Sequence, residues 1–220
     1  LNGPSSREQL MSRDVYEHLF LGHMHFAGSA DKSFYRLVRS TTPPGEPVRE
    51  LPTVRPFDDP GSAPFWYRLR PYDASIVAKS HVPYELSNAR LARLNELFLV
   101  PEYAVVEQPG YALPDAANPF IIFDAIPVRS RYEFLLDDAR CFIQGFIKGP
   151  VCRGQVALNV IEDQFWVFFL NPDLQLADDP DKALLGVADY LQMPSKTDTL
   201  NIGAAYGKYW KLQKEFLAAK

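Results

Sequence analysis

The sequence is short of cysteine, of positive charge and of long apolar runs, and each shortage excludes a class of protein. Only two of the 220 residues are cysteine, Cys141 and Cys152, and their spacing matches neither a zinc motif nor C-x-x-C. The 23 Lys and Arg residues are outnumbered by 27 Asp and Glu, which argues against a nucleic-acid binder with a basic footprint. The longest strongly apolar run, residues 165–170, is far shorter than the ~20 residues of a membrane-spanning helix.

Common catalytic and nucleotide-binding motifs are also missing. The chain contains no G-x-G-x-x-G, P-loop, H-E-x-x-H or G-x-S-x-G pattern. Nucleotide-dependent and hydrolytic functions therefore lose most of their support.

Proline and aromatic residues are plentiful instead. There are 19 prolines, aromatic residues make up 13% of the chain, and 47% of the residues are hydrophobic. This composition predicts an aromatic-rich core under long ordered loops, in a chain long enough for one domain. We expect residues 1–220 to form a single domain that is part of a longer protein, because Lys220 lies inside a helical pattern and Leu1 follows no leader.

Capping boxes and residue periodicity predict an α+β fold, with helices and short strands alternating irregularly between Pro-rich loops. An S-x-x-E box at Ser5 predicts a helix over 6–21, and Ser87 or Asn88 begins a second helix that ends near Phe98. A second S-x-x-E box at Ser130 predicts one helix that continues to Lys148. A loop is predicted over 107–118. Strands are predicted over 34–40, 65–70, 75–81, 120–126 and 165–170, with further helices over 154–161, from 179 to before Pro194, and over 200–219.

Three of the four histidines, His18, His23 and His25, fall within eight positions. Imidazole is a common ligand of metals and haem iron. On one continuous helix no two of the three could bind the same ion, but if the helix ends at Gly22, His23 and His25 face one side of an extended segment, ~6.6 Å apart. Hydrogen-bonded structural histidines, a catalytic or haem-facing role and a metal site all remain open.

A second concentration of reactive groups includes Lys148, Cys152 and Arg153. A cysteine beside a cation and at a helix start is stabilised as thiolate, so Cys152 could act as a nucleophile. The alternative is a tight turn between helices with a small apolar cysteine beneath it. A disulfide between Cys141 and Cys152 is also geometrically possible.

Basic and aromatic residues are interleaved between Lys32 and Lys79. This segment contains eight Lys and Arg residues and five acidic residues. Guanidinium groups match anionic head groups, and Trp and Tyr favour membrane interfaces. Residues 65–72 could therefore dock on an anionic lipid surface, or they could form a solvated sheet face with mixed ion pairs.

Longer strings of the sequence resemble the bacterial fatty acid cis/trans isomerases over about three quarters of the chain. FIKGPVCRGQ is the most specific part of this resemblance. The strings are YEHLFLGHMHF (16–26), FYRLVRSTTPPG (34–45), RPFDDPG (55–61), SIVAKSHVPYEL (75–86), NPFIIFDAIPVRSRYEFLLDDA (118–139) and FIKGPVCRGQVALNVIEDQFWVFFLNPD (146–173).

The resemblance implies an enzyme that converts cis double bonds of membrane-lipid acyl chains into trans bonds without moving them. It also implies a periplasmic, membrane-contacting c-type haem protein, although the C-x-x-C-H attachment motif does not occur within these 220 residues. We therefore expect haem c only in the full-length protein. The catalytic candidates are His23, His25, Cys152, Arg153 and Lys148, and His18, His23 and His25 are the candidates for facing haem. The alternative is a non-catalytic module that contacts haem or docks on the membrane.

Overall fold

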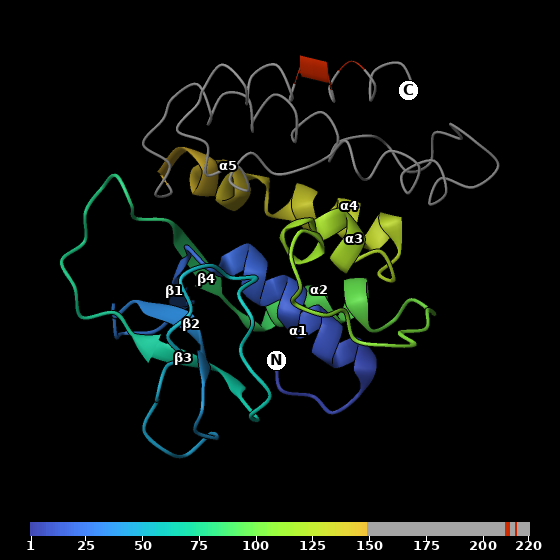
Figure 1. Ribbon diagram of the computed structural model, residues 1–220. Helices are drawn as coiled ribbons and strands as arrows, with labels where there is room; N and C mark the ends of the chain where they lie inside the picture. The colour runs from blue at the N-terminus through green and yellow to red at the C-terminus, as the bar shows by residue number, and fades with distance from the viewer. Residues whose placement is uncertain (149–209, 212–213, 215–220) are drawn as a thin grey trace.

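The structure is a computed structural model that describes residues 1–148, 210–211 and 214 (Figure 1). Helices and a mixed sheet occur together in this part of the chain, so the predicted α+β class is confirmed. The elements in chain order are α1 (Ser6–Leu19), β1 (His23–Phe26), β2 (Tyr35–Ser40), β3 (Trp66–Pro71), β4 (Pro83–Leu86), α2 (Asn88–Phe98), the 3-10 helix η1 (Asp115–Ala117), α3 (Pro119–Ile122), α4 (Val128–Asp137) and α5 (Ala139–Lys148).

The four strands lie in the order β3-β2-β1-β4. β2 is antiparallel to both β1 and β3, whereas β4 is parallel to β1, with His23 opposite Pro83. β4 is an edge strand, so Pro83 can occupy its first position without costing the ladder a hydrogen bond.

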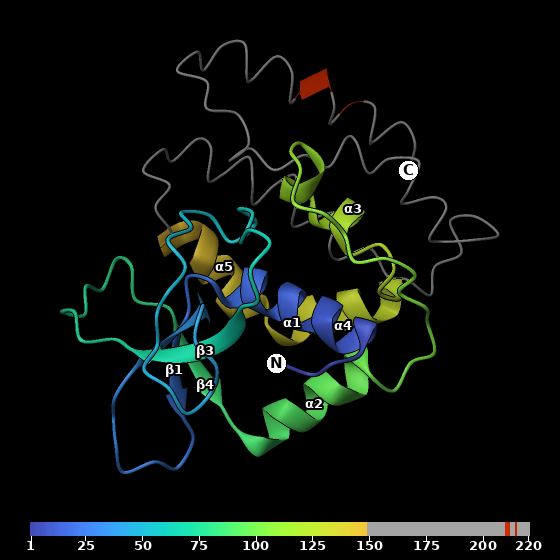
Figure 2. The same ribbon diagram turned by 60° about the horizontal axis from the view of Figure 1, so that its bottom comes forward.

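α1 provides the helical side of the core. Its start is capped as the sequence predicts, with reciprocal hydrogen bonds between Ser5 and Glu8. Leu10, Val15 and Leu19 are almost fully buried and belong to one apolar cluster with residues of the sheet and of α2, α3 and α4. The helices gather on one side of the sheet in both views (Figures 1 and 2).

Two predicted strands are wrong. Residues 75–81 form an exposed loop with a turn in which the Ser80 N–H donates to the Val77 carbonyl, and the strand β4 begins only at Pro83. Residues 120–126 include α3 rather than a strand, because Asn118 accepts a hydrogen bond from the Phe120 N–H and Pro119 occupies the first helical position. A short apolar run does not by itself distinguish a buried strand from a buried helix.

The predicted helix from Ser130 to Lys148 is two helices. α4 begins at Val128 after Pro127 with no side-chain cap, so the capping box expected at Ser130 does not form. α4 ends at Asp137 and α5 begins at Ala139. The helices α1 and α2 and the strands β2 and β3 lie close to their predicted positions, and the predicted loop over 107–118 contains only the short η1.

Of the elements predicted after residue 153, the structure describes only residues 210–211 and 214 of the helix over 200–219, and these are helical. The rest lie outside the described residues and stay predictions. Within the part that the structure does describe, no helix is long and apolar enough to cross a bilayer.

Candidate functional site

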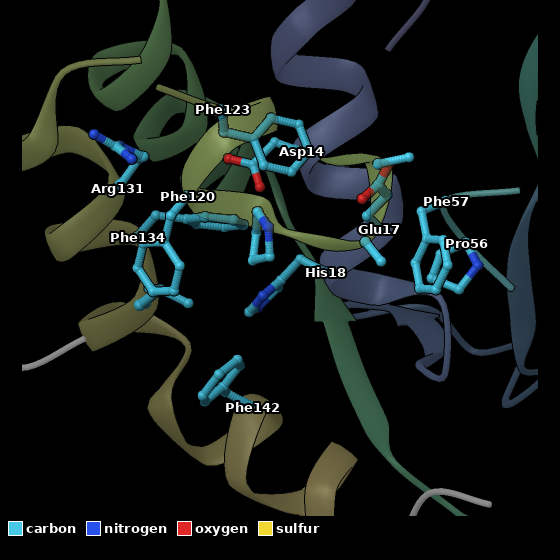
Figure 3. Close-up of a pocket in the computed structure, with 14 residues that line it drawn as sticks. Asp14, Glu17, His18, Pro56, Phe57, Phe120, Phe123, Arg131, Phe134 and Phe142 are labelled. Atoms are coloured by element: carbon cyan, nitrogen blue, oxygen red, sulfur yellow. The ribbon is translucent and has the colours of Figure 1, made fainter. Parts of the chain in front are cut away.

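A cavity of about 180 Å³ lies between α1, α3, α4, α5 and the loop before β3 (Figure 3). Ten of its fourteen lining residues are apolar, and the four polar ones are Asp14, Glu17, His18 and Arg131. Five lining side chains are phenylalanines, namely Phe57, Phe120, Phe123, Phe134 and Phe142. The lining is therefore mostly apolar, with three polar residues on α1 and one, Arg131, on α4.

Local structure explains how these side chains meet. Asp14 and His18 are four residues apart on α1 and so lie on one face of the helix. The Asn118 cap starts α3 and brings Phe120 to the cavity, while the break between α4 and α5 allows Phe134 and Phe142 to line it from two directions. In Figure 3 the α1 side chains face these phenylalanines across the cavity.

Both acids of the cavity, Asp14 and Glu17, have a raised pKa. Burial raises the pKa of the Asp14 carboxyl to about 7, with the charge of His18 acting against that rise and the charge of Glu17 adding to it. Burial also raises the pKa of Glu17, although the ion pair with Arg13 opposes this shift. Near neutral pH the Asp14 side chain therefore exists partly as an uncharged acid, which an apolar ligand tolerates better than a carboxylate.

His18 is held in place by Asp138, the residue between α4 and α5. Its Nε2 lies 3.4 Å from Asp138 Oδ2, and its ring lies 4.6 Å from the Phe134 ring. Asp138 also accepts a hydrogen bond from the Tyr84 hydroxyl at 2.8 Å and pairs with Arg90 Nη1 at 2.7 Å. Burial alone would raise the pKa of Asp138, but His18, Tyr84 and Arg90 together lower it, so this carboxylate is a fixed negative charge beside the cavity.

The predicted pair His23 and His25 lies in β1, as expected if the helix ends before Gly22. His23 is buried beside the rings of Tyr72 and His81, and its Nδ1 accepts a hydrogen bond from the Val82 N–H. Burial lowers the pKa of His23 to about 4, so it is neutral at physiological pH. His25 contacts Phe34. The phenylalanine cavity is lined by His18 and by neither of these two residues.

The other sequence-predicted site cannot be placed. Cys152 and Arg153 lie outside the described residues, and Lys148 is known only as the last residue of α5. Cys141 is half-buried, and burial raises the pKa of its thiol to about 12, so it is not a thiolate near neutral pH. Cys141 is a free cysteine in the structure, so the disulfide with Cys152 that the sequence allowed does not form.

The described residues fit neither a metal ion nor a covalently bound haem. No group of three or more His, Cys, Asp or Glu side chains is arranged to hold a metal within the described ranges. Covalent haem attachment requires C-x-x-C-H, which the sequence does not contain. His23 Nε2 is a buried nitrogen without a hydrogen-bond partner in the described part, but it lies against Tyr72 and His81 and lines no described cavity.

Sequence reasoning missed most of the cavity. Asp14, Phe57, Phe120 and Arg131 were not among the candidates, although the spacing of Asp14 and His18 on one helix face was a readable signal. The phenylalanines carried no such signal, because an aromatic residue of the core and one that lines a cavity look the same in sequence.

The fold and the cavity define an α+β protein with a small, mostly apolar cavity. Residues 1–220 match the family model described as fatty acid cis/trans isomerase (CTI), so the chain belongs to the fatty acid cis/trans isomerase family. The comparisons with curated proteins and with solved structures gave no match. The family named from the sequence strings is thus confirmed, and three of those strings supply cavity residues, among them His18, Phe57 and Phe120.

Proposed function

We propose that this protein acts in the cis-to-trans isomerisation of double bonds in unsaturated fatty acids of membrane lipids, without shifting the bond along the chain. The family match over the whole chain supports the reaction, and the phenylalanine cavity carries the proposal for where the acyl chain binds. Each buried methylene contributes about 0.8 kcal/mol, so an apolar cavity favours an acyl segment strongly.

The size of the cavity limits what enters it. At about 180 Å³ it is smaller than the roughly 300–1,000 Å³ typical of sites for whole ligands, so we assign it to one segment of the acyl chain. Phe120, Phe134 and Phe142 would fix the orientation of that segment and exclude water. His18, oriented by Asp138, is one of the four polar residues that line the cavity.

Cys152, Arg153 and Lys148 stay proposed participants. Rotation about a double bond requires a temporary decrease in bond order, and addition of a thiolate followed by its expulsion is one route to that decrease. The Cys152→Ser variant tests this route. Loss of isomerisation in a folded variant would establish it, whereas retained activity, which we expect, would exclude Cys152 as the nucleophile. Haem remains a proposal for the full-length family protein alone, together with a periplasmic location.

The test is an isomerisation assay on protein that contains these 220 residues. Oleate or oleoyl phospholipid is incubated with the protein, and the fatty acids are separated by gas chromatography. We expect a trans-9 product with the double bond in its original position. The yield of this product should be at least about tenfold lower with Phe120→Asp. It should equal the wild-type yield with Val106→Asp, a matched change at an exposed position. Binding of oleate with no isomerisation by the full-length protein would instead favour the non-catalytic module.

Contact with the membrane is part of the proposal, because the acyl chains reside there. Within residues 65–72, the two arginines are already engaged by the protein itself. Arg68 donates hydrogen bonds to the carbonyls of Thr42, Pro43 and Glu46, and Arg70 pairs with Glu50. The loop after β3 instead exposes Ile76 and Val77 and projects from the sheet (Figures 1 and 2). Co-sedimentation with anionic liposomes should decrease for the Ile76→Ser/Val77→Ser double variant and not for Val106→Ser. If the double variant binds the liposomes as well as the wild type does, this loop does not contact the membrane.

A further inference from the structure

A second cavity, of about 490 Å³, lies on the neighbouring side of α1. Gln9, Ser12 and Arg13 line it from the helix, whereas Asp14, Glu17 and His18 line the phenylalanine cavity. Its other walls are the residues before and within the start of β3 and the loop around Tyr111. The Arg13–Glu17 ion pair, with Nε 2.8 Å from Oε1, therefore joins the two cavities.

A buried cluster beside the second cavity has more positive than negative charge. Arg13 is 4% exposed and Arg39 is 1% exposed, and both guanidinium groups lie over the Tyr111 ring. Arg13 is paired with Glu17. Arg39 donates to the Thr53 hydroxyl at 3.1 Å and the Asp58 carbonyl at 2.8 Å, and in the described part of the chain it has no carboxylate partner.

The tyrosines of this cluster cannot balance the charge. Burial raises the pKa of Tyr67 and of Tyr111 above the ordinary value, so both hydroxyls stay protonated. The cluster of Arg13, Arg39 and Glu17 therefore holds at least one excess positive charge, because burial raises the pKa of Glu17 and favours its uncharged form. A buried charge is costly unless it is paired.

Arg13 also has unused hydrogen-bonding capacity. Its Nη1 donates to the carbonyls of Pro109 and Gly110 at 2.5 and 3.1 Å, whereas Nη2 is buried without a hydrogen-bond partner in the described residues. The Arg39 Nε is in the same condition. A guanidinium group with free N–H donors matches the two oxygens of a carboxylate or the oxygens of a phosphate.

We propose that this second cavity is an anion subsite for the head group of the acyl ligand, namely the carboxylate of a free fatty acid. The assignment to a fatty acid rests on the proposed function, whereas the excess charge and the unused donors do not depend on it. The phosphate of a phospholipid has the same recognition chemistry, and the test separates the two sources. Phe65 and Trp66 at the cavity would contact the carbons next to the head group.

The experiment compares ligands that have one chain and different head groups. The affinities of oleate, methyl oleate and oleyl phosphate for the protein are measured by titration calorimetry. Oleate should bind at least about tenfold more tightly than its uncharged ester, because hydrogen bonds between charged groups are stronger than neutral ones. Tighter binding of oleyl phosphate than of oleate would support the subsite and assign it to phospholipid.

Two sets of variants keep the test independent of folding. Arg13→Gln should abolish the preference for oleate and leave methyl oleate unchanged. Because Arg13 is buried and its replacement can also affect folding, the exposed lining residue Ser62 provides a second test. Ser62→Asp should lower the affinity for oleate about threefold through charge repulsion. The uncharged control Ser62→Asn should leave that affinity unchanged.

The outcomes separate this proposal from the proposed function. The subsite is overturned if the wild type binds oleate and methyl oleate with equal affinity. It is also overturned if neither Arg13→Gln nor Ser62→Asp changes the affinity for oleate. Either result leaves acyl-chain binding intact. If neither oleate nor methyl oleate binds, acyl-chain binding fails, and inorganic phosphate then decides the subsite. Phosphate binding that is lost in Ser62→Asp but kept in Ser62→Asn supports it, and no phosphate binding overturns it.

Discussion

Asp14 is an acid whose environment makes stability depend on pH. Its pKa is about 7 in the folded chain and near 3.8 when unfolded. Between these values the unfolded carboxyl ionises while the folded one stays protonated, so this residue lowers the free energy of unfolding as pH rises from about 4 to 7. We expect Asp14→Asn to be more stable than wild type at pH 8, by on the order of a few kcal/mol, and nearly equal at pH 4.

Urea unfolding across this pH range measures the difference. Asp73→Asn, on the exposed loop after β3, is the control and should follow the wild type throughout. If Asp14→Asn also follows the wild type at every pH, the acid is not buried as described.

His23 and His25 allow a second comparison on one strand. His23→Ala removes a buried ring and the acceptor for the Val82 N–H, so we expect a loss of about 2–4 kcal/mol in the free energy of unfolding. His25 is only partly buried, and His25→Ala should cost less than about 1 kcal/mol. Because the pKa of His23 is lowered to about 4, its advantage over alanine should shrink as pH falls from 6.5 towards 4.

Thermal or urea unfolding of both variants at pH 7 checks this order. Equal stabilities would mean that His23 is not a structural residue, and a catalytic or haem-facing role would then regain support.

At the scale of elements, the break between α4 and α5 falls at Asp138. Its carboxylate is 1% exposed and is bound by Tyr84, Arg90 and His18, so Asp138→Ala leaves buried partners unpaired and should cost about 3–5 kcal/mol. The neighbouring Asp137 pairs with Arg93 where both side chains are 30% exposed, so Asp137→Ala should cost less than about 1 kcal/mol. Urea unfolding at pH 7 compares the two, and equal costs would contradict a structural role for the Asp138 contacts.

The helices whose start is determined by a local capping signal could be predicted from the sequence. The box at Ser5 and the cap at Ser87 predicted α1 and α2 because side chain and backbone satisfy each other within one turn. The contacts of Asp138 at the break were not predictable, since they are made with a residue of β4 and with two residues of other helices. In the same way, Ile76 and Val77 look like a strand in sequence, but they pair with no strand in the described part of the chain.

At the scale of the whole molecule, the phenylalanine cavity is assembled from segments far apart in sequence. Its residues come from α1, from the loop at Phe57 and from the stretch between η1 and α5. Sequence reasoning recognised the family from strings that contain several of these residues, but periodicity and spacing within one segment cannot show that distant segments meet. The histidine nearest the cavity is therefore His18, and not the pair in β1 that the spacing favoured.

The central claim is that an acyl chain binds in the phenylalanine cavity, and photo-crosslinking tests it most directly. The protein is irradiated with an oleate analogue that carries a diazirine near the middle of its chain, and the labelled residues are mapped by mass spectrometry. The account predicts labels on cavity residues such as Phe120, Leu135 and Phe57, competed by unlabelled oleate. Labels that are competed by oleate but fall only on residues outside this cavity would contradict it.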